Sequence, residues 1–262
     1  MQTPESSLEV LAKLRATIPK VYIPTTGPDD WQRFLAAPAK QWRTGFSAKT
    51  LAYCWECADG GLPNEIASML RPHGGEVELL LAIPEYRVAL PGASRGESQS
   101  DIFALARAGH RTFAITVEGK VNEPFSETVG DWLQTASEGK RERLAFICDL
   151  LGLTLPVPDH IHYQLLHRTA SAVIEARRFK TDAAAMIVHS FSRERMRFGD
   201  FAQFASLFDT AKEVTVVDRL LGFSARICGK GTTVYFLPLV PEQLDGSRPI
   251  PGVVIGWRMC TP

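Results

Sequence analysis

The chain has 262 residues, of which 45% are hydrophobic and 22% are charged, as in an ordinary globular protein. Its 29 Lys and Arg residues balance its 29 Asp and Glu residues, which excludes a global positive field that would draw the chain to nucleic acid. The apolar stretch 77–83 is too short to span a bilayer, and the N-terminus has no signal-peptide pattern. The five cysteines therefore predict reduced thiols in a cytoplasm, without a membrane partner.

The first part of the chain carries helical patterns. Helices are predicted at residues 8–18, 31–36, 48–58 and 63–70. Ser47 is the expected N-cap of the third of these helices, and Pro63 fits the first turn of the fourth. Residues 77–83 then predict a buried strand, which residues 85–90 either continue or turn back against.

A β-hairpin is predicted next, because two apolar runs flank the turn signal Ala108-Gly109. If these two residues form the turn, Arg107 pairs with His110 and Asp101 lies opposite Thr116. Glu118 is then a diagonal neighbour of Asp101, roughly 5–8 Å away.

Side chains alternate along the second strand of this hairpin, so Thr116, Glu118 and Lys120 share one face. Asp101 and Glu118 are then close enough to bind one hard divalent cation through oxygen. Such a cation activates a water molecule and polarises a phosphoryl oxygen, while Lys120 orients the water or offsets developing charge. The alternative is an ordinary surface ion pair between Glu118 and Lys120 on a solvated face of the sheet.

Asp101, followed by Glu118-Gly119-Lys120 at the end of an apolar strand, resembles the PD-(D/E)XK nuclease superfamily. The core of that superfamily, the restriction-endonuclease-like fold, runs helix, three antiparallel strands, helix, strand. The likeness covers about residues 47–192 and suggests an uncharacterised bacterial family. It implies a nuclease that hydrolyses phosphodiester bonds of nucleic acid with Mg²⁺ or Mn²⁺ as cofactor. Asp101 and Glu118 would bind the metal and Lys120 would position or activate water, although Ser100 stands where the ideal motif has Pro.

The resemblance also implies supporting residues. A Glu on the first helix of the core often completes the metal site, and Glu56 is the candidate here, with Glu65 in reserve. Glu56 is as well explained as a solvated carboxylate on the flank of its helix. Gln164 and Arg168 lie one turn apart on the helix after the Glu-x-Lys strand, where the resembled enzymes often carry polar residues that help the site.

Regular elements continue to the end of the chain. Helices are predicted at residues 138–151, 161–179 and 199–208, with a buried strand at 183–191. Composition predicts further strands at residues 213–218, 223–228, 232–237 and 253–257.

Two other patterns have ordinary explanations. Cys54 and Cys57 form a Cys-x-x-Cys inside a predicted helix, where buried thiols are favoured over a redox or zinc motif. A set of basic residues follows the last core helix and strand: Arg168, Arg177, Arg178, Lys180, Arg193, Arg195 and Arg197. These residues either meet a phosphate backbone or belong to solvated faces.

The sequence therefore predicts an α/β (α+β) protein with a central mixed β-sheet flanked by helices. Residues 1–262 form one domain, with an N-terminal helical segment 1–46, a nuclease-like core 47–192 and a β-rich C-terminal extension 193–262. The predicted function is a metal-dependent nuclease or phosphodiesterase. The alternative is an inactive nuclease-like fold that binds protein or nucleic acid. The sequence leaves the oligomeric state open, with a homodimer among the options.

Overall fold

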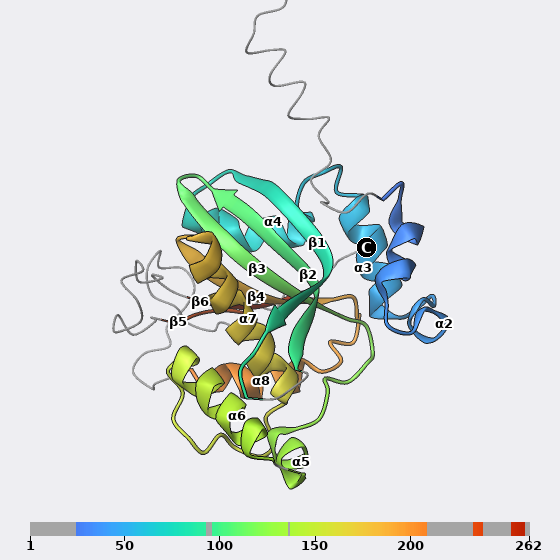
Figure 1. The fold of residues 1–262 in the computed structure, drawn as a ribbon. Helices are drawn as coiled ribbons and strands as arrows, with labels where there is room; N and C mark the ends of the chain where they lie inside the picture. Colours follow the sequence, from blue (N-terminus) through green and yellow to red (C-terminus); the bar gives the residue numbers. More distant parts are fainter. Residues whose placement is uncertain (1–24, 93–95, 136, 209–232, 238–252, 260–262) are drawn as a thin grey trace, which may run out of the picture.

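The structure is a computed structural model that describes residues 25–92, 96–135, 137–208, 233–237 and 253–259 (Figure 1). Its centre is a six-stranded sheet with the order β1-β2-β3-β4-β6-β5. The strands are β1 (Val77–Ala89), β2 (Glu97–Ala108), β3 (Arg111–Lys120), β4 (Ala183–Ser190), β5 (Thr233–Leu237) and β6 (Val253–Met259). The predicted helix at 8–18 and the predicted strands at 213–218 and 223–228 lie outside the described residues.

The sheet is mixed, as the sequence predicts. Strands β1, β2 and β3 form an antiparallel meander, while β4 is parallel to both of its neighbours, β3 and β6. Strand β5 pairs antiparallel with β6. The β4 residues are all buried, which explains its continuous apolar sequence Ala-Ala-Ala-Met-Ile-Val, typical of a parallel strand covered on both faces.

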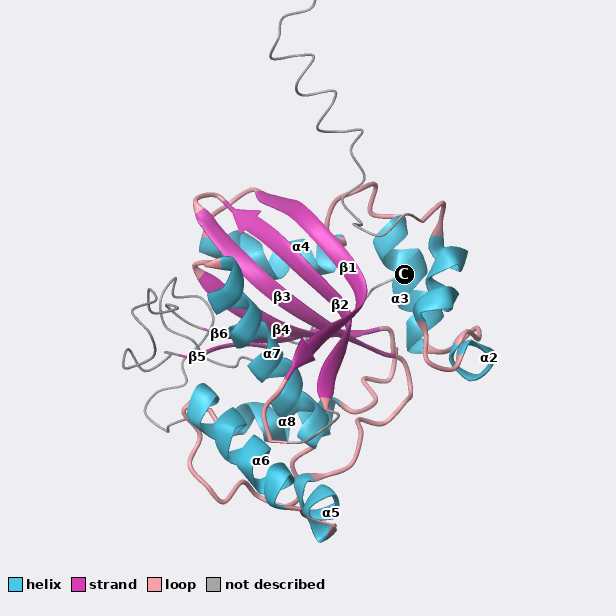
Figure 2. Cartoon of the chain, viewed as in Figure 1, coloured by secondary structure: helices cyan, strands magenta, loops and turns pink. Residues whose placement is uncertain are grey.

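Helices cover both faces of the sheet. One layer consists of η1 (Pro28–Phe34), α2 (Pro38–Gln41), α3 (Ser47–Glu56), α4 (Asn64–Leu70) and η2 (Arg71–His73). The other consists of α5 (Val129–Gln134), α6 (Glu138–Leu151), α7 (Tyr163–Phe179) and α8 (Phe198–Ser206). Figure 2 shows α7 crossing one face of the sheet while α4 lies behind the other. None of the described helices is long and apolar enough to cross a membrane.

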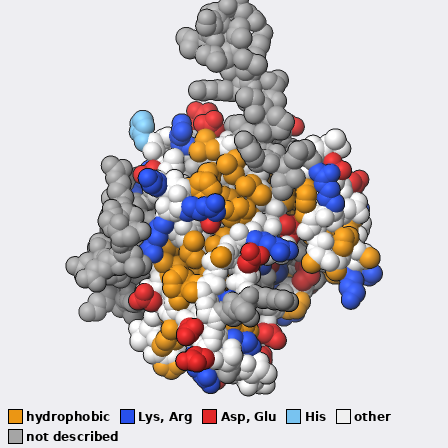
Figure 3. Space-filling view, in the orientation of Figure 1, with side chains coloured by type: hydrophobic (Ala, Val, Ile, Leu, Met, Phe, Trp, Pro, Cys, Tyr) orange, Lys and Arg blue, Asp and Glu red, His pale blue; other side chains and the backbone are white. Residues whose placement is uncertain are grey.

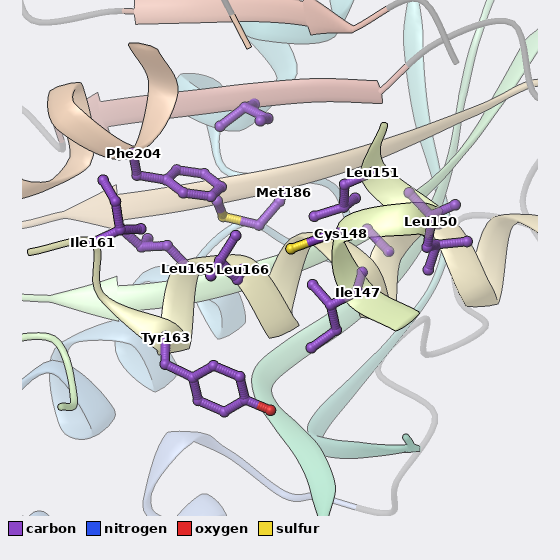
Figure 4. Close-up of a cluster of buried hydrophobic side chains, with 14 of the residues drawn as sticks. Ile147, Cys148, Leu150, Leu151, Ile161, Tyr163, Leu165, Leu166, Met186 and Phe204 are labelled. Atoms are coloured by element: carbon purple, nitrogen blue, oxygen red, sulfur yellow. The ribbon is translucent and has the colours of Figure 1, made fainter. Parts of the chain in front are cut away.

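Alternation along β3 divides the core into two parts. Phe113, Ile115 and Val117 pack toward Leu51 and Trp55 of α3. Ala114, between them, belongs to the larger cluster on the α7 side. In that cluster, the apolar side chains of α6 and α7 meet those of β4 and α8, including Ile147, Leu166, Met186 and Phe204 (Figure 4). Burial of these two sets of apolar side chains fixes which face of β3 points to each helical layer.

The predicted hairpin exists, but the predicted turn was wrong by one residue. Ala108 pairs with Arg111, so the two-residue loop is Gly109-His110. Gly109 has a φ of +57°, and a Cβ at this position would lie 2.2 Å from the carbonyl oxygen of Gly74. The left-handed conformation and this close approach require glycine as the first loop residue. Thr116 consequently faces Phe103 rather than Asp101.

Other boundaries also differ from the prediction. The N-cap of α3 is Phe46, not Ser47, and the Ser47 N–H donates instead to the Glu123 carboxylate at 2.6 Å. Strand β1 continues through residues 85–90 as far as Ala89, and β2 starts at Glu97, four residues before Asp101. Helix α5 was not predicted.

Candidate active site

Strand register brings three acidic residues to the same level of the sheet. Glu85 lies between the pairs Pro84–Ile102 and Tyr86–Ser100, which places it level with Asp101. Glu118 is also level with Asp101, because both come one position beyond the pair Ile102–Val117. Adjacent strands β1, β2 and β3 therefore contribute Glu85, Asp101 and Glu118 to one row, which we call the carboxylate row.

The carboxylate row lies where two strands diverge. Beyond Ile102 and Val117, β2 remains paired with β1, whereas β3 remains paired with β4. At this fork, Asp101 Oδ2 accepts a hydrogen bond from the N–H of Gly119 at 2.7 Å. A side-chain carboxylate thus pairs with a backbone donor of β3 just beyond the end of the β2–β3 ladder.

Glu118 is the most strongly held member of the row. Its Oε1 accepts hydrogen bonds from Lys120 Nζ at 2.6 Å and from Gln164 Nε2 at 2.7 Å. Its Oε2 accepts from Arg168 Nε at 2.8 Å. Glu118 is only 3% exposed, so the two cations offset the cost of burying its charge. The structure thus brings together four predicted site residues, Glu118, Lys120, Gln164 and Arg168.

The pKa values of the row differ because the cations lie closest to Glu118. Burial acts to raise the pKa of Glu118, but Lys120 and Arg168 outweigh it, and the pKa is lowered. Burial raises the pKa of Asp101 well above its usual value, and the charges of Glu118 and Glu85 add to this effect. Burial also raises the pKa of Glu85, to about 7. The hydrogen bond from Gln99 acts to lower this pKa, and the charge of Glu118 acts to raise it.

Glu85 was missed by the sequence analysis. Its carboxylate Oε2 accepts a hydrogen bond from Gln99 Nε2 at 2.6 Å. Its backbone has a φ of +52°, an unusual conformation for a residue with a side chain and one that costs about 1–3 kcal/mol. Because a long strand with a distorted residue does not keep strict alternation, sequence spacing could not place Glu85 beside Asp101.

Lys120 is held in a fixed position. Besides its bond to Glu118, the ammonium lies 5.0 Å from the centre of the Phe125 ring, over its face. A cation over an aromatic face is attracted by the ring electrons. The ammonium is thus anchored by a carboxylate and an aromatic ring at the end of β3.

Arg168 is oriented by a second set of contacts. Its Nη1 donates to Ser98 Oγ at 3.1 Å, and Ser98 Oγ also contacts His167 Nδ1 at 2.8 Å. Burial, followed by the charges of Arg168 and Arg143, lowers the pKa of His167 well below its usual value. The imidazole is therefore neutral at pH 7 and adds no positive charge beside Arg168.

The two predicted helix acids have other partners. Glu56 Oε1 accepts from Trp31 Nε1 at 2.6 Å and from Thr25 Oγ1 at 2.9 Å, so it ties the segment before α3 to that helix. Glu65 lies near Cys54 and His189. The structure places the third carboxylate of the row on β1, as Glu85, and not on a helix.

The donor set of the carboxylate row fits a hard divalent cation. Carboxylate oxygens are the ligands that Mg²⁺ and Mn²⁺ prefer. Glu118 already accepts three hydrogen bonds, whereas burial and neighbouring carboxylate charge raise the pKa values of Asp101 and Glu85. A bound cation would be held mainly by these two residues, with Glu118 at its side. Binding it would require side-chain rotation, because Glu85, Asp101 and Glu118 do not place one oxygen each within 4.8 Å of the other two.

Comparison with known proteins gives a family without a function. A family model described as a domain of unknown function, DUF6946, matches residues 24–236. No curated protein and no solved structure matches the chain.

Proposed function

Since the chain belongs to the DUF6946 family, whose function is unknown, we propose its activity from the chemistry of the carboxylate row. We infer that it is a metal-dependent phosphodiesterase that hydrolyses nucleic acid. The observation that carries this proposal is the row of Glu85, Asp101 and Glu118 at one fork in the sheet, with the Lys120 ammonium held 2.6 Å from Glu118. Burial raises the pKa values of two of these carboxylates, Asp101 and Glu85. Perturbed carboxylates beside a fixed cation are typical of catalytic sites.

Each residue has a defined role in this proposal. A Mg²⁺ or Mn²⁺ ion held by Asp101, Glu85 and Glu118 would supply positive charge to a phosphoryl oxygen and lower the pKa of water. Lys120 holds its ammonium where it orients the attacking water or offsets the charge that develops on phosphate. Gln164 and Arg168 are positioning residues, because their bonds fix the Glu118 carboxylate that in turn holds Lys120.

The resemblance to PD-(D/E)XK nucleases supports nucleic acid as the substrate class. Not all basic residues near the site are available for phosphate, however. Arg168 is buried against Glu118, and Arg178 bonds to Tyr86 and Glu175. In Figure 3, Lys and Arg are interspersed with Asp and Glu around an apolar centre. We therefore propose a substrate contact confined to the site and to the exposed Arg193, which follows β4 two residues after Phe191, whose N–H donates to the Lys120 carbonyl oxygen.

A second candidate function follows from the bonds of Glu118. A carboxylate that is fully engaged by Lys120, Arg168 and Gln164 also suits a purely structural charge cluster. In that case the chain would be a binding module with a nuclease-like fold and no catalysis. Metal binding at Asp101 together with cleavage of nucleic acid distinguishes the two candidates.

The test is the melting temperature of the purified chain with and without Mn²⁺. An ion at 100 times its Kd stabilises the native state by about 2.7 kcal/mol and raises Tm by roughly 5–10 °C in a chain of this size. We expect this shift in the wild type and its loss in Asp101→Asn. Glu97→Gln, which changes an exposed carboxylate on the same strand, should retain the shift.

Hydrolysis completes the test. Single- and double-stranded DNA and RNA oligonucleotides are incubated with Mg²⁺ or Mn²⁺, and we expect cleavage by the wild type and a loss of at least 100-fold in Lys120→Met. A Tm shift that persists unchanged in Asp101→Asn would contradict the metal site. A metal-dependent Tm shift without cleavage of any of these substrates would favour the binding module.

A further inference from the structure

A second group of metal-ligating side chains lies on the other face of the sheet. Cys54 of α3, Glu65 of α4 and His189 of β4 place one donor atom each within 4.8 Å of the other two. Among the described residues, no other three His, Cys, Asp or Glu side chains meet this criterion. The three positions are far apart in sequence, so the fold alone assembles this group, which we call the Cys-Glu-His cluster.

Strand alternation explains how His189 reaches the cluster. Ala185 and Ile187 belong to the core on the α3 and α4 side, and His189 continues the same face of β4. His189 is fully buried, and its ring centre lies 4.4 Å from that of Phe191. Cys54 and Glu65 are half-buried, so the cluster has a buried wall and an open side.

The chemistry of the cluster differs from that of the carboxylate row. A thiolate and an imidazole are the ligands of zinc, whereas Mg²⁺ and Mn²⁺ favour oxygen alone. Zinc bonds are about 2.3 Å to sulfur and about 2.0–2.2 Å to nitrogen and oxygen, so a bound ion draws its ligand atoms to roughly 3–4 Å apart. Donor atoms within 4.8 Å reach this geometry by side-chain rotation.

We propose that Cys54 Sγ, the Glu65 carboxylate and a His189 ring nitrogen bind one zinc ion. Three protein ligands leave the fourth tetrahedral position to water, on the open side of the cluster. This inference does not depend on the proposed phosphodiesterase activity, because no residue of the carboxylate row takes part.

Cobalt titration of the full chain tests the proposal. Co²⁺ occupies tetrahedral zinc sites, and a bound thiolate gives an intense sulfur-to-cobalt charge-transfer band in the near ultraviolet. After treatment with a chelator, we expect the band to saturate at about one equivalent of Co²⁺ and to disappear when Zn²⁺ is added. The band should be absent in Cys54→Ser, and Glu65→Gln should weaken Co²⁺ binding at least tenfold.

Cys57→Ser is the matched control, because Cys57 lies three positions away, at the end of the same helix, and is exposed. Cys57→Ser should keep the band. Asp101→Asn should keep it too, because Asp101 belongs to the carboxylate row and not to the Cys-Glu-His cluster. A wild-type chain without the band, or a band that is lost with Cys57 rather than with Cys54, would overturn the proposal.

A second measurement uses only the wild type and so does not require any variant to fold. Thiols are alkylated with iodoacetamide with and without Zn²⁺, and the modified cysteines are identified by mass spectrometry. Zinc should slow alkylation of Cys54 at least tenfold and leave Cys57 unchanged. Equal rates at Cys54 with and without Zn²⁺ would contradict the cluster as a zinc site.

Discussion

The three acids of the carboxylate row occupy similar positions but have different surroundings. Glu118 lies between Lys120 and Arg168, and this pairing lowers its pKa. Burial raises the pKa values of Asp101 and Glu85, and neighbouring carboxylate charges add to this effect. The arrangement places one carboxylate of lowered pKa beside two of raised pKa.

Glu85→Gln is the most direct test of this charge distribution. A carboxylate with a pKa of about 7 in the folded state and 4.5 in the unfolded state binds more protons when folded between these values. Its contribution to stability is present below pH 4.5 and is lost as the pH rises through 7. Without metal, Glu85→Gln should therefore become more stable than the wild type between pH 5 and 8, by on the order of 2 kcal/mol.

Urea denaturation in EDTA at pH 5 and pH 8 measures this difference. Glu97→Gln serves as the control, since its carboxylate is exposed and should give the same free energy of unfolding relative to wild type at both pH values. If the difference in free energy of unfolding between Glu85→Gln and the wild type does not grow with pH, the pKa of Glu85 is not raised in the folded state.

At the scale of elements, the start of α3 depends on a distant carboxylate. Glu123 follows β3 in the chain, and its Oε1 accepts the N–H of Ser47 while its Oε2 accepts the N–H groups of Val121 and Asn122. A negative charge at a helix N-terminus is favourable, and here it also joins α3 to the end of the site strand. Burial acts to raise the pKa of Glu123, but the backbone N–H donors, Ser47 first among them, lower it.

Glu123→Gln should destabilise the chain by about 1–2 kcal/mol at pH 7, the usual cost of a lost cap with a charged acceptor. Because the folded pKa is lowered, this stability is present above the unfolded value near 4.5 and lost as the pH falls through the folded value. Guanidinium denaturation at pH 7 and pH 3.5 should show a smaller difference at the lower pH. Glu127→Gln, which changes an exposed neighbouring carboxylate, should leave the free energy of unfolding unchanged at both pH values.

At the scale of the whole molecule, charge balance limits how the chain binds a polyanion. With 29 basic and 29 acidic residues, attraction to nucleic acid comes from local contacts only. We expect the logarithm of the association constant for an oligonucleotide to fall with the logarithm of salt concentration with a slope of about −3 or shallower. Fluorescence anisotropy between 50 and 200 mM salt measures the slope, and Arg193→Ala should make it shallower by about one unit. A slope near −6 or steeper would require a broad basic surface instead.

The elements of the fold were largely predictable because their patterns are local. The predicted helix 138–151 coincides with α6, and the predicted helix 161–179 differs from α7 only at its start. Alternation along β3 correctly separated Glu118 and Lys120 from the apolar face. These predictions depend on helix and strand periodicity, which the sequence displays directly.

The details of the site were not predictable because they depend on contacts between distant segments. The hairpin turn is set by the approach of Gly109 to Gly74, which no local pattern reveals. Glu85 joins the row through strand register and a left-handed backbone conformation. The sequence around Cys54 predicted only a buried thiol on a helix. Its position beside His189 depends on how α3 packs against the sheet, which no local pattern reveals. The sequence analysis named a helix acid, Glu56, beside Asp101 and Glu118, whereas strand register places Glu85 of β1 in the row with them.

The bond from Gly119 to Asp101 gives the protein a spectroscopic probe of its own site. The amide proton of Gly119 is held by a titrating side chain rather than by a carbonyl group. In ¹H–¹⁵N correlation spectra, the Gly119 signal should move as Asp101 gains a proton and again as a divalent ion is added. The Gly130 amide, which donates to the main-chain oxygen of Asp159 at 2.9 Å, provides an internal reference that should stay in place. A single resonance can thus report proton and metal occupancy of Asp101 before any substrate is known.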